Sequence, residues 1–254
     1  MRRKTCGTLG AAAEFLAIAL LALGLARPAF PQANAAAPKT SPTASNHLRT
    51  TGTTTSTVSP AFGPPVKTYG SKNAPITMEV FTDYQCPSCR NLFEQTLRPL
   101  INEYVASGKV YLIHHDFPLP MHRYGYEAAR WANAAARVGQ FGNVEAALYD
   151  HQDAWGADGN IAKYVEDAVP AADFKRIEKL MQGCEDRSTP TSAAQGPGCA
   201  LDSYIEQDRA IGLQIPVQST PTYVISRKGQ KLPAGTGVVS WPILKQFFDS
   251  LLSS

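Results

Sequence analysis

Residues 76–105 contain the feature that most limits how this chain folds: an apolar strand pattern runs directly into Cys-Pro-Ser-Cys, and a helical pattern follows. Ile76 to Thr82 is rich in β-branched and aromatic residues and follows Pro75, which is typical of a strand. After the cysteines, apolar residues recur at three- and four-residue spacings until Gly108, which predicts a helix with one buried face. Pro99 lacks a backbone N–H and should kink this helix.

A second strand is predicted at Val110 to Ile113, so that strand, helix and strand form a βαβ unit. From about 121 to 213 the pattern is helical, without a convincing strand. Strand character returns at Thr222 to Ser226, and an Arg-Lys-Gly-Gln turn leads into a short strand near Lys231 to Pro233, a plausible hairpin. Ser240 is expected to cap a last helix. The predicted fold class is therefore α/β, with a helical insertion at about 121–213.

The first 35 residues have the composition of an export signal. Basic residues at 2–4 precede an apolar run from Phe15 to Ala26, and small residues around Ala33–Ala35 suit a signal peptidase. Spanning a bilayer takes about 20 apolar residues, more than this run holds, so a permanent membrane anchor is the less favoured alternative. We expect a periplasmic or other extracytoplasmic protein. Residues 36–65, rich in Thr, Ser, Ala and Pro, predict a flexible linker before a domain at 66–254.

The charge distribution argues against nucleic acid as a partner. The formal net charge is +3, and four basic residues and one acidic residue before position 36 account for all of it. The rest of the chain is neutral and has no basic stripe with interleaved aromatic residues.

The chain has five cysteines, of which Cys6 lies in the expected signal segment. The remaining four are an even number in an exported chain, which favours disulfide chemistry. Cys184 and Cys199 flank a stretch rich in Ser, Pro and Gly at 186–198, and we expect a structural disulfide between them. A second redox pair that relays electrons to the Cys-Pro-Ser-Cys pair is the alternative.

Cys86 and Cys89 are the candidate reactive pair. Cys86 should lie at a helix N-terminus with an exposed sulfur, where unpaired N–H groups and the helix dipole lower its pKa from about 8.5. Cys89, one turn further along, should be shielded and act as the resolving thiol. Such a pair exchanges dithiol for disulfide without a bound cofactor. Asp83 is either a solvated acid at the strand end or a proton-transfer group for Cys89.

Half of a zinc site, an inert structural bridge and chance spacing are the alternatives for this pair. A zinc site would be completed by Cys184, Cys199, His114, His115, His122 or His151. No second closely spaced Cys or His pair is present, and an oxidising compartment disfavours stable thiolate ligation. We therefore expect no metal, and we expect His114, His115 and His122 to be surface or capping residues.

Residues 80–85 followed by Cys-Pro-Ser-Cys resemble the DsbA-like group of thioredoxin-fold proteins, and the match covers most of residues 66–254. It also includes Ala74-Pro75, Pro99, Phe117-Pro118-Leu119 and Ser219-Thr220-Pro221-Thr222. The resemblance implies a thioredoxin-like fold with an inserted helical domain. It further implies that Pro221 is cis and faces the cysteines, so that Thr220 and Pro221 form the wall on which client backbone docks. An ordinary strand-entry proline is the alternative for Pro221.

The resemblance implies a thiol-disulfide oxidoreductase that oxidises exported client proteins with free thiols. A membrane quinone-linked partner would re-oxidise it. Pro87 and Ser88 depart from the Pro-His of the strongest oxidases and from the Gly-Pro of thioredoxin. Ser88 offers only a hydroxyl and a backbone N–H to the Cys86 thiolate, so we expect an oxidant weaker than the Pro-His type and stronger than thioredoxin.

Two other functions stay open at this point. A thiol reductase or isomerase would use the same pair, although residues 36–65 are too polar and too few for an isomerase-type dimerisation domain. A non-enzymatic metal-binding or chaperone-like module is the third hypothesis.

Overall fold

The computed structural model of the protein describes residues 65–184 and 199–253. The expected signal segment at 1–35, nearly all of the expected linker at 36–65, and the Ser-, Pro- and Gly-rich stretch at 186–198 lie outside these residues. No helix within the described ranges is long and apolar enough to cross a membrane.

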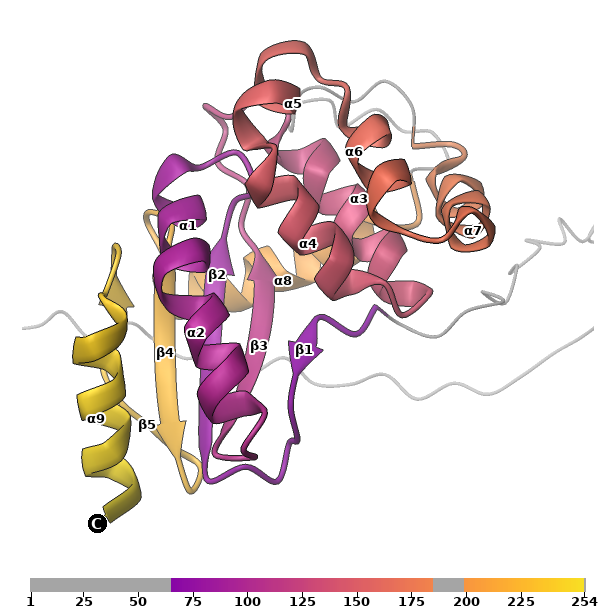
Figure 1. The fold of residues 1–254 in the computed structure, drawn as a ribbon. Helices are drawn as coiled ribbons and strands as arrows, with labels where there is room; N and C mark the ends of the chain where they lie inside the picture. The colour runs from indigo at the N-terminus through magenta and orange to yellow at the C-terminus, as the bar shows by residue number, and fades with distance from the viewer. Residues whose placement is uncertain (1–64, 185–198, 254) are drawn as a thin grey trace, which may run out of the picture. The chain divides into compact units, whose positions relative to one another are not determined.

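A mixed β-sheet forms the centre of the described domain (Figure 1). Its strands are β1 (Thr68–Tyr69), β2 (Ile76–Thr82), β3 (Val110–Asp116), β4 (Thr222–Arg227), β5 (Gln230–Lys231) and β6 (Gly235–Thr236). The strand order is β1-β3-β2-β4-β5, and β6 also pairs with β4. Only β2 and β3 run parallel, as the expected βαβ unit requires, and the other pairs are antiparallel.

The strands agree with the sequence patterns in their positions and differ in their ends. The structure extends β3 three residues beyond the predicted Ile113, to Asp116. The predicted hairpin is present, and its turn residues Lys228 and Gly229 have φ values of 49° and 80°. Two positive φ values are what a type I′ turn requires, which explains the glycine. The two-residue strands β1 and β6 leave no periodic pattern in the sequence and were not predicted.

One helical run from Pro87 to Val105 connects β2 to β3. It consists of α1 (Pro87–Leu92), a π-helical segment η1 (Phe93–Leu97), α2 (Arg98–Leu100) and a second π-helical segment η2 (Ile101–Val105). Pro99 therefore lies between two wider turns. Proline removes a backbone donor and crowds the carbonyl four residues earlier, so a local change in hydrogen bonding is the expected response.

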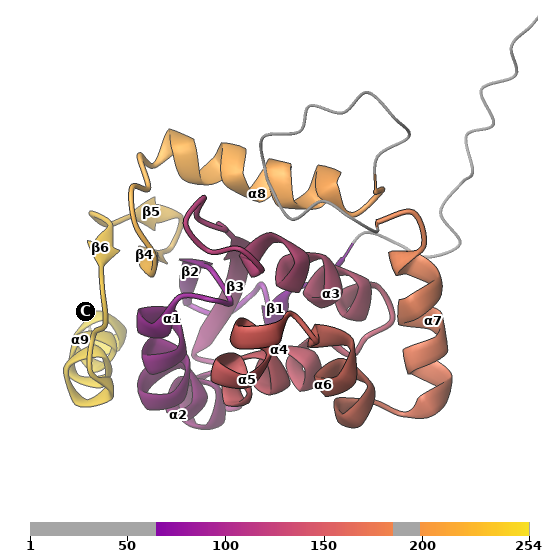
Figure 2. The same ribbon diagram turned by 90° about the horizontal axis from the view of Figure 1, so that it is seen from above.

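Helices cover both faces of the sheet. Those between β3 and β4 are α3 (Gly125–Arg137), α4 (Phe141–Asp150), α5 (Gln152–Asp158), α6 (Ile161–Ala168), α7 (Ala171–Met181) and α8 (Asp202–Gln214), and α9 (Trp241–Ser253) follows the sheet. Figure 2 shows α8 on one face, with α1 and α2 on the other. The predicted helical stretch at 121–213 agrees closely with α3–α8, and α9 begins directly after Ser240 as expected.

Alternation along β2 divides the core between the two faces. Ile76, Met78 and Val80 are fully buried in the larger core. Phe81 belongs to a smaller core with Phe117, Val217 and Val224. Val217 belongs to the segment that leads to Pro221, so packing on this face helps to position the second half of the candidate site.

Candidate active site

Cys86 occupies the N-cap position of α1, and Cys89 lies inside the first turn. Cys86 has extended backbone angles, φ −77° and ψ 120°, and its carbonyl accepts the N–H groups of Cys89 (3.0 Å) and Arg90 (3.2 Å). Pro87 has no N–H to leave unpaired at the first helical position, which suits a proline there. The local sequence therefore explains why the two cysteines lie one helical turn apart at the start of α1.

The cysteines differ less in exposure than expected. Cys89 is fully buried, and Cys86 is only 7% exposed. The expectation of an exposed Cys86 sulfur is therefore wrong, because the segment around Thr220 covers it. Pro87 and Ser88 are exposed.

The two thiols have opposite electrostatic surroundings. The Cys89 side chain, the Thr220 side chain and the backbone N–H groups of Cys89 and Ser88 all interact with the Cys86 sulfur and lower its pKa to about 5, although burial opposes them. Burial raises the pKa of Cys89 well above its usual value, and the neighbouring Cys86 adds to this. The reduced pair therefore holds one thiolate at neutral pH, on Cys86, and one thiol.

Thr220 and Pro221 lie where the resemblance implies. The peptide bond between them is cis. The Cys86 sulfur lies 3.4 Å from the carbonyl oxygen of Thr220. The Thr220 hydroxyl is buried beside the cysteine pair. The segment that enters β4 therefore faces the cysteine pair.

Asp83 is buried, so the expectation of a solvated strand-end acid is wrong. Its carboxylate accepts hydrogen bonds from the backbone N–H groups of Gln85 (2.8 Å) and Leu119 (2.7 Å) and pairs with the imidazole of His122, with 2.7 Å between Oδ2 and Nδ1. The backbone N–H of Asp83 lies 3.5 Å from the Cys89 sulfur. Asp83 thus joins the cysteine pair to the loop after β3.

The helical insertion also contacts the cysteine segment, through residues that sequence reasoning missed. The amide of buried Gln152 donates to the carbonyls of Tyr84 (2.6 Å) and Cys86 (3.0 Å). Gln85 accepts the N–H of Tyr124 at 2.6 Å. A single glutamine in a helical stretch carries no recognisable pattern, so only the folded chain reveals this contact.

His114 and His115 are buried, contrary to the expectation of surface residues. His114 bridges Thr82 (2.7 Å) and Glu145 (2.8 Å), and His115 bridges Asp208 (2.8 Å) and Glu79 (3.1 Å). They were misjudged because β3 continues through both of them into the core. Within the described residues, no group of three or more His, Cys, Asp or Glu side chains is placed to hold a metal ion.

Cys184 and Cys199 form a disulfide. Cys184 follows α7, and Cys199 precedes α8. The buried guanidinium of Arg130 donates to the carbonyl of Cys184 at 3.2 Å and pairs with Asp202 at 2.7 Å. The disulfide therefore belongs to the packing of the helical insertion.

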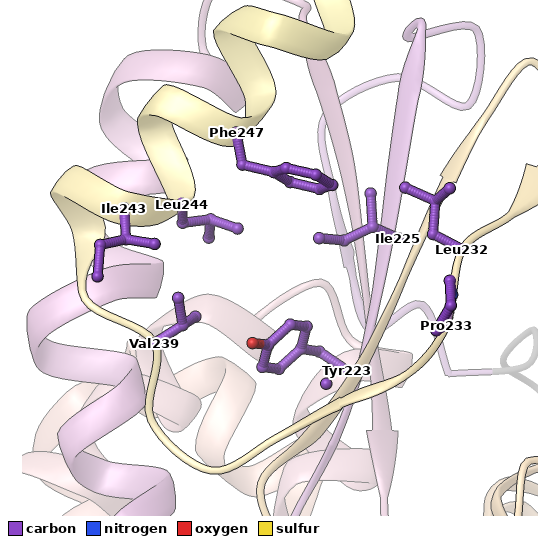
Figure 3. A pocket seen from close by; sticks show the side chains of 9 residues that line it. Tyr223, Ile225, Leu232, Pro233, Val239, Ile243, Leu244 and Phe247 are labelled. Carbon is purple, nitrogen blue, oxygen red and sulfur yellow. The ribbon is translucent and has the colours of Figure 1, made fainter.

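An apolar hollow of about 270 Å³ lies between β4, the segment after it and α9 (Figure 3). Tyr223, two residues after Pro221, points into it together with Ile225. On the α9 side, Ile243 is 64% exposed and Phe247 is 41% exposed. The strand that follows the cis proline therefore leads directly into an accessible apolar surface.

Three comparisons with known proteins agree with this geometry. A family model described as thioredoxin matches residues 64–232. The crystal structure of alpha-DsbA1 from Wolbachia pipientis superposes on this chain with a TM-score of 0.55. The two sequences are 18% identical, and the match covers 74% of this chain and 90% of that one. BdbD from Bacillus subtilis, in its oxidised form, is 16% identical, with a TM-score of 0.54, over 76% of this chain and 98% of that one. These likenesses confirm the expected α/β, thioredoxin-like fold with inserted helices.

One curated relative is a much longer protein than this chain. The Na(+)/H(+) antiporter NhaA 3 of Salinispora tropica is 34% identical over 184 residues, which are 72% of this chain. The chain spans only about a quarter of that protein's length, 25%.

Proposed function

The chain belongs to the thioredoxin family of thiol-disulfide oxidoreductases, and we propose that it works as an extracytoplasmic oxidase of client thiols through Cys86 and Cys89. The observation that carries the proposal is the opposite shift of the two thiol pKa values, to about 5 for Cys86 and upward for buried Cys89. A stabilised Cys86 thiolate favours the reduced form of the pair. A pair whose reduced form is stabilised is a stronger oxidant.

The reaction begins with the Cys86–Cys89 disulfide. A client thiolate attacks the sulfur of Cys86, a mixed disulfide forms, and Cys89 leaves and takes up a proton. A second client thiolate then attacks the client sulfur of the mixed disulfide, and Cys86 leaves as a thiolate. The client loses two electrons and gains a disulfide, while the enzyme gains two electrons and retains one thiolate and one thiol.

Two surfaces support a polypeptide client. The Thr220–Pro221 segment presents backbone next to the Cys86 sulfur, suited to a client strand. The apolar hollow that includes Tyr223 and Phe247 is suited to apolar side chains of an unfolded chain (Figure 3).

The location and the redox partner are part of the same proposal. The composition of residues 1–35 supports export, and a disulfide between Cys184 and Cys199 suits an oxidising compartment. Re-oxidation by a membrane quinone-linked protein follows from the family resemblance and would return the Cys86–Cys89 disulfide.

The test is the equilibrium of the full chain with glutathione, combined with oxidation of a reduced, unfolded model protein. We expect a reduction potential between about −120 mV, the value of the strongest oxidases, and about −270 mV, that of thioredoxin. We also expect stoichiometric transfer of one disulfide to the client. A potential at or below that of thioredoxin would favour the reductase instead. Stoichiometric zinc that is lost in Cys86→Ser would overturn the redox function.

A further inference from the structure

The groups that lower the pKa of Cys86 through hydrogen bonds are uncharged, so a nearby cation would stabilise the Cys86 thiolate further. Ser88 is exposed and uncharged. Arg90, which follows Cys89, is already paired with Asp153 at 2.8 Å. His122 reaches the cysteine pair through Asp83: its Nδ1 lies 2.7 Å from Asp83 Oδ2, and the carbonyl of Asp83 accepts the N–H of Cys86 at 3.0 Å. The charge of Cys86 also raises the pKa of His122. A residue 36 positions after Cys86 therefore becomes the candidate.

The position of His122 is fixed by Asp83. The Nδ1 atom of His122 lies 2.7 Å from Oδ2 of Asp83, whose side chain is fully buried. Backbone N–H groups of Gln85 and Leu119 hold the carboxylate on its other sides. Gly125 closes the site, since a Cβ at that position would come within 2.5 Å of the carboxylate. The imidazole thus has one defined orientation.

The surroundings of His122 favour its cationic form. The hydrogen bond to Asp83 raises the pKa of His122 most, the charges of Asp83 and Cys86 raise it further, and partial burial opposes these effects. The side chain is 18% exposed, so it can exchange a proton with solvent. Coupling is reciprocal, and a cation that the thiolate stabilises must itself stabilise the thiolate.

We propose that His122, held by Asp83, is a positioning residue that supplies the positive charge opposite the Cys86 thiolate and thereby makes the Cys86–Cys89 pair a stronger oxidant. The inference rests on the proposed oxidase function. In the oxidised pair Cys86 carries no charge, so the cation stabilises only the reduced form. When a client gives up two electrons, the pair becomes the Cys86 thiolate and the Cys89 thiol, and His122 keeps its proton.

The decisive comparison uses three full-length variants. His122→Gln removes the charge, His122→Arg keeps it, and His151→Gln removes an exposed histidine that stacks on Tyr164 outside the site. The Cys86 pKa is read from thiolate absorbance, and the redox equilibrium is measured against glutathione. In His122→Gln we expect a Cys86 pKa about one unit higher and an oxidation equilibrium about tenfold weaker, or about 30 mV more negative.

The charge-conserving variant separates charge from structure. The redox equilibrium constant of His122→Arg should stay within about threefold of the wild-type value, and its Cys86 pKa within about half a unit. His151→Gln should have the wild-type values of both. Equal changes of the Cys86 pKa and the redox equilibrium in His122→Gln and His122→Arg would show a packing effect and overturn the inference. An unchanged pKa and equilibrium in His122→Gln would overturn it as well. The wild-type potential alone tests the oxidase function, so the two can fail separately.

A measurement on the wild type covers the case in which His122→Gln does not fold. The imidazole of His122 is titrated by NMR in the oxidised and the reduced protein. We expect a higher pKa for His122 in the reduced protein, because only that form contains the Cys86 thiolate. The same value in both forms overturns the inference.

Discussion

The carbonyl oxygen of Thr220 lies 3.4 Å from the sulfur of Cys86, although the two residues are 134 positions apart in the chain. This contact joins the first turn of α1 to the segment that enters β4. It leaves Cys86 7% exposed and places polypeptide backbone directly beside the reactive sulfur. The candidate site is therefore built from a helix N-terminus and a strand-entry segment that lie far apart in the chain.

Alkylation of the reduced protein at pH 6 to 7 should be restricted to Cys86. Its pKa of about 5 makes it a thiolate there, whereas buried Cys89 keeps its proton. Brief treatment with iodoacetamide followed by peptide mass spectrometry measures the ratio of alkylated Cys86 to alkylated Cys89. In denaturant both cysteines should react. Comparable modification of Cys89 in the folded protein would contradict the assignment of roles.

The stability of the reduced protein should depend on pH through Cys86. The folded pKa is about 5, below the value of about 8.5 for an unfolded thiol. The stabilisation of the folded protein by the Cys86 thiolate is therefore complete above about pH 8.5. It declines as the pH falls and is absent below the folded pKa. Urea unfolding measures the free energy of unfolding of the reduced wild type and of reduced Cys86→Ala. The advantage of the wild type should grow as the pH rises through this window. The oxidised protein should lack this dependence on Cys86.

Gln152→Leu should lower the free energy of unfolding by about 1–3 kcal/mol. It removes the hydrogen bonds to the carbonyls of Tyr84 and Cys86. Gln182→Leu, at an exposed position after α7, is the matched control. Urea titrations give both values. Equal, small effects would mean that Gln152 does not hold the cysteine segment.

Two helical glycines should respond oppositely to alanine. A Cβ at Gly212 in α8 would come within 2.7 Å of the ring of Phe117, so overpacking should cost Gly212→Ala about 1–3 kcal/mol. A Cβ at Gly156 in α5 meets only the Gln85 side chain, at 3.7 Å. Gly156→Ala should therefore be neutral or gain up to about 1 kcal/mol. Thermal unfolding distinguishes the two, and a stable Gly212→Ala would refute the tight packing of α8 on Phe117.

The double variant Cys184→Ala/Cys199→Ala should lose about 3 kcal/mol of stability, on the chain-entropy account of a disulfide that closes a loop of 15 residues. The potential of the Cys86–Cys89 pair should not change. Denaturant unfolding and glutathione equilibration measure the two effects. A changed potential would instead support the electron relay considered from the sequence.

Much of the fold could be predicted because it depends on local patterns. The strand at 76–82, the helix that begins after Cys86 and the Lys228–Gly229 hairpin follow from residue spacing and turn chemistry. The short strands β1 and β6 could not be predicted, because each has only two residues. They exist because β3 and β4 offer them free edges.

The sequence by itself determined which two cysteines start a helix after a strand, since that depends on neighbours along the chain. Only the tertiary structure decided that Asp83 is buried, that His122 pairs with it, and that Thr220 covers Cys86. These contacts join residues 39 and 134 positions apart. The physical reason is that periodicity reports which side of an element is buried, whereas packing of whole elements decides which polar groups meet there.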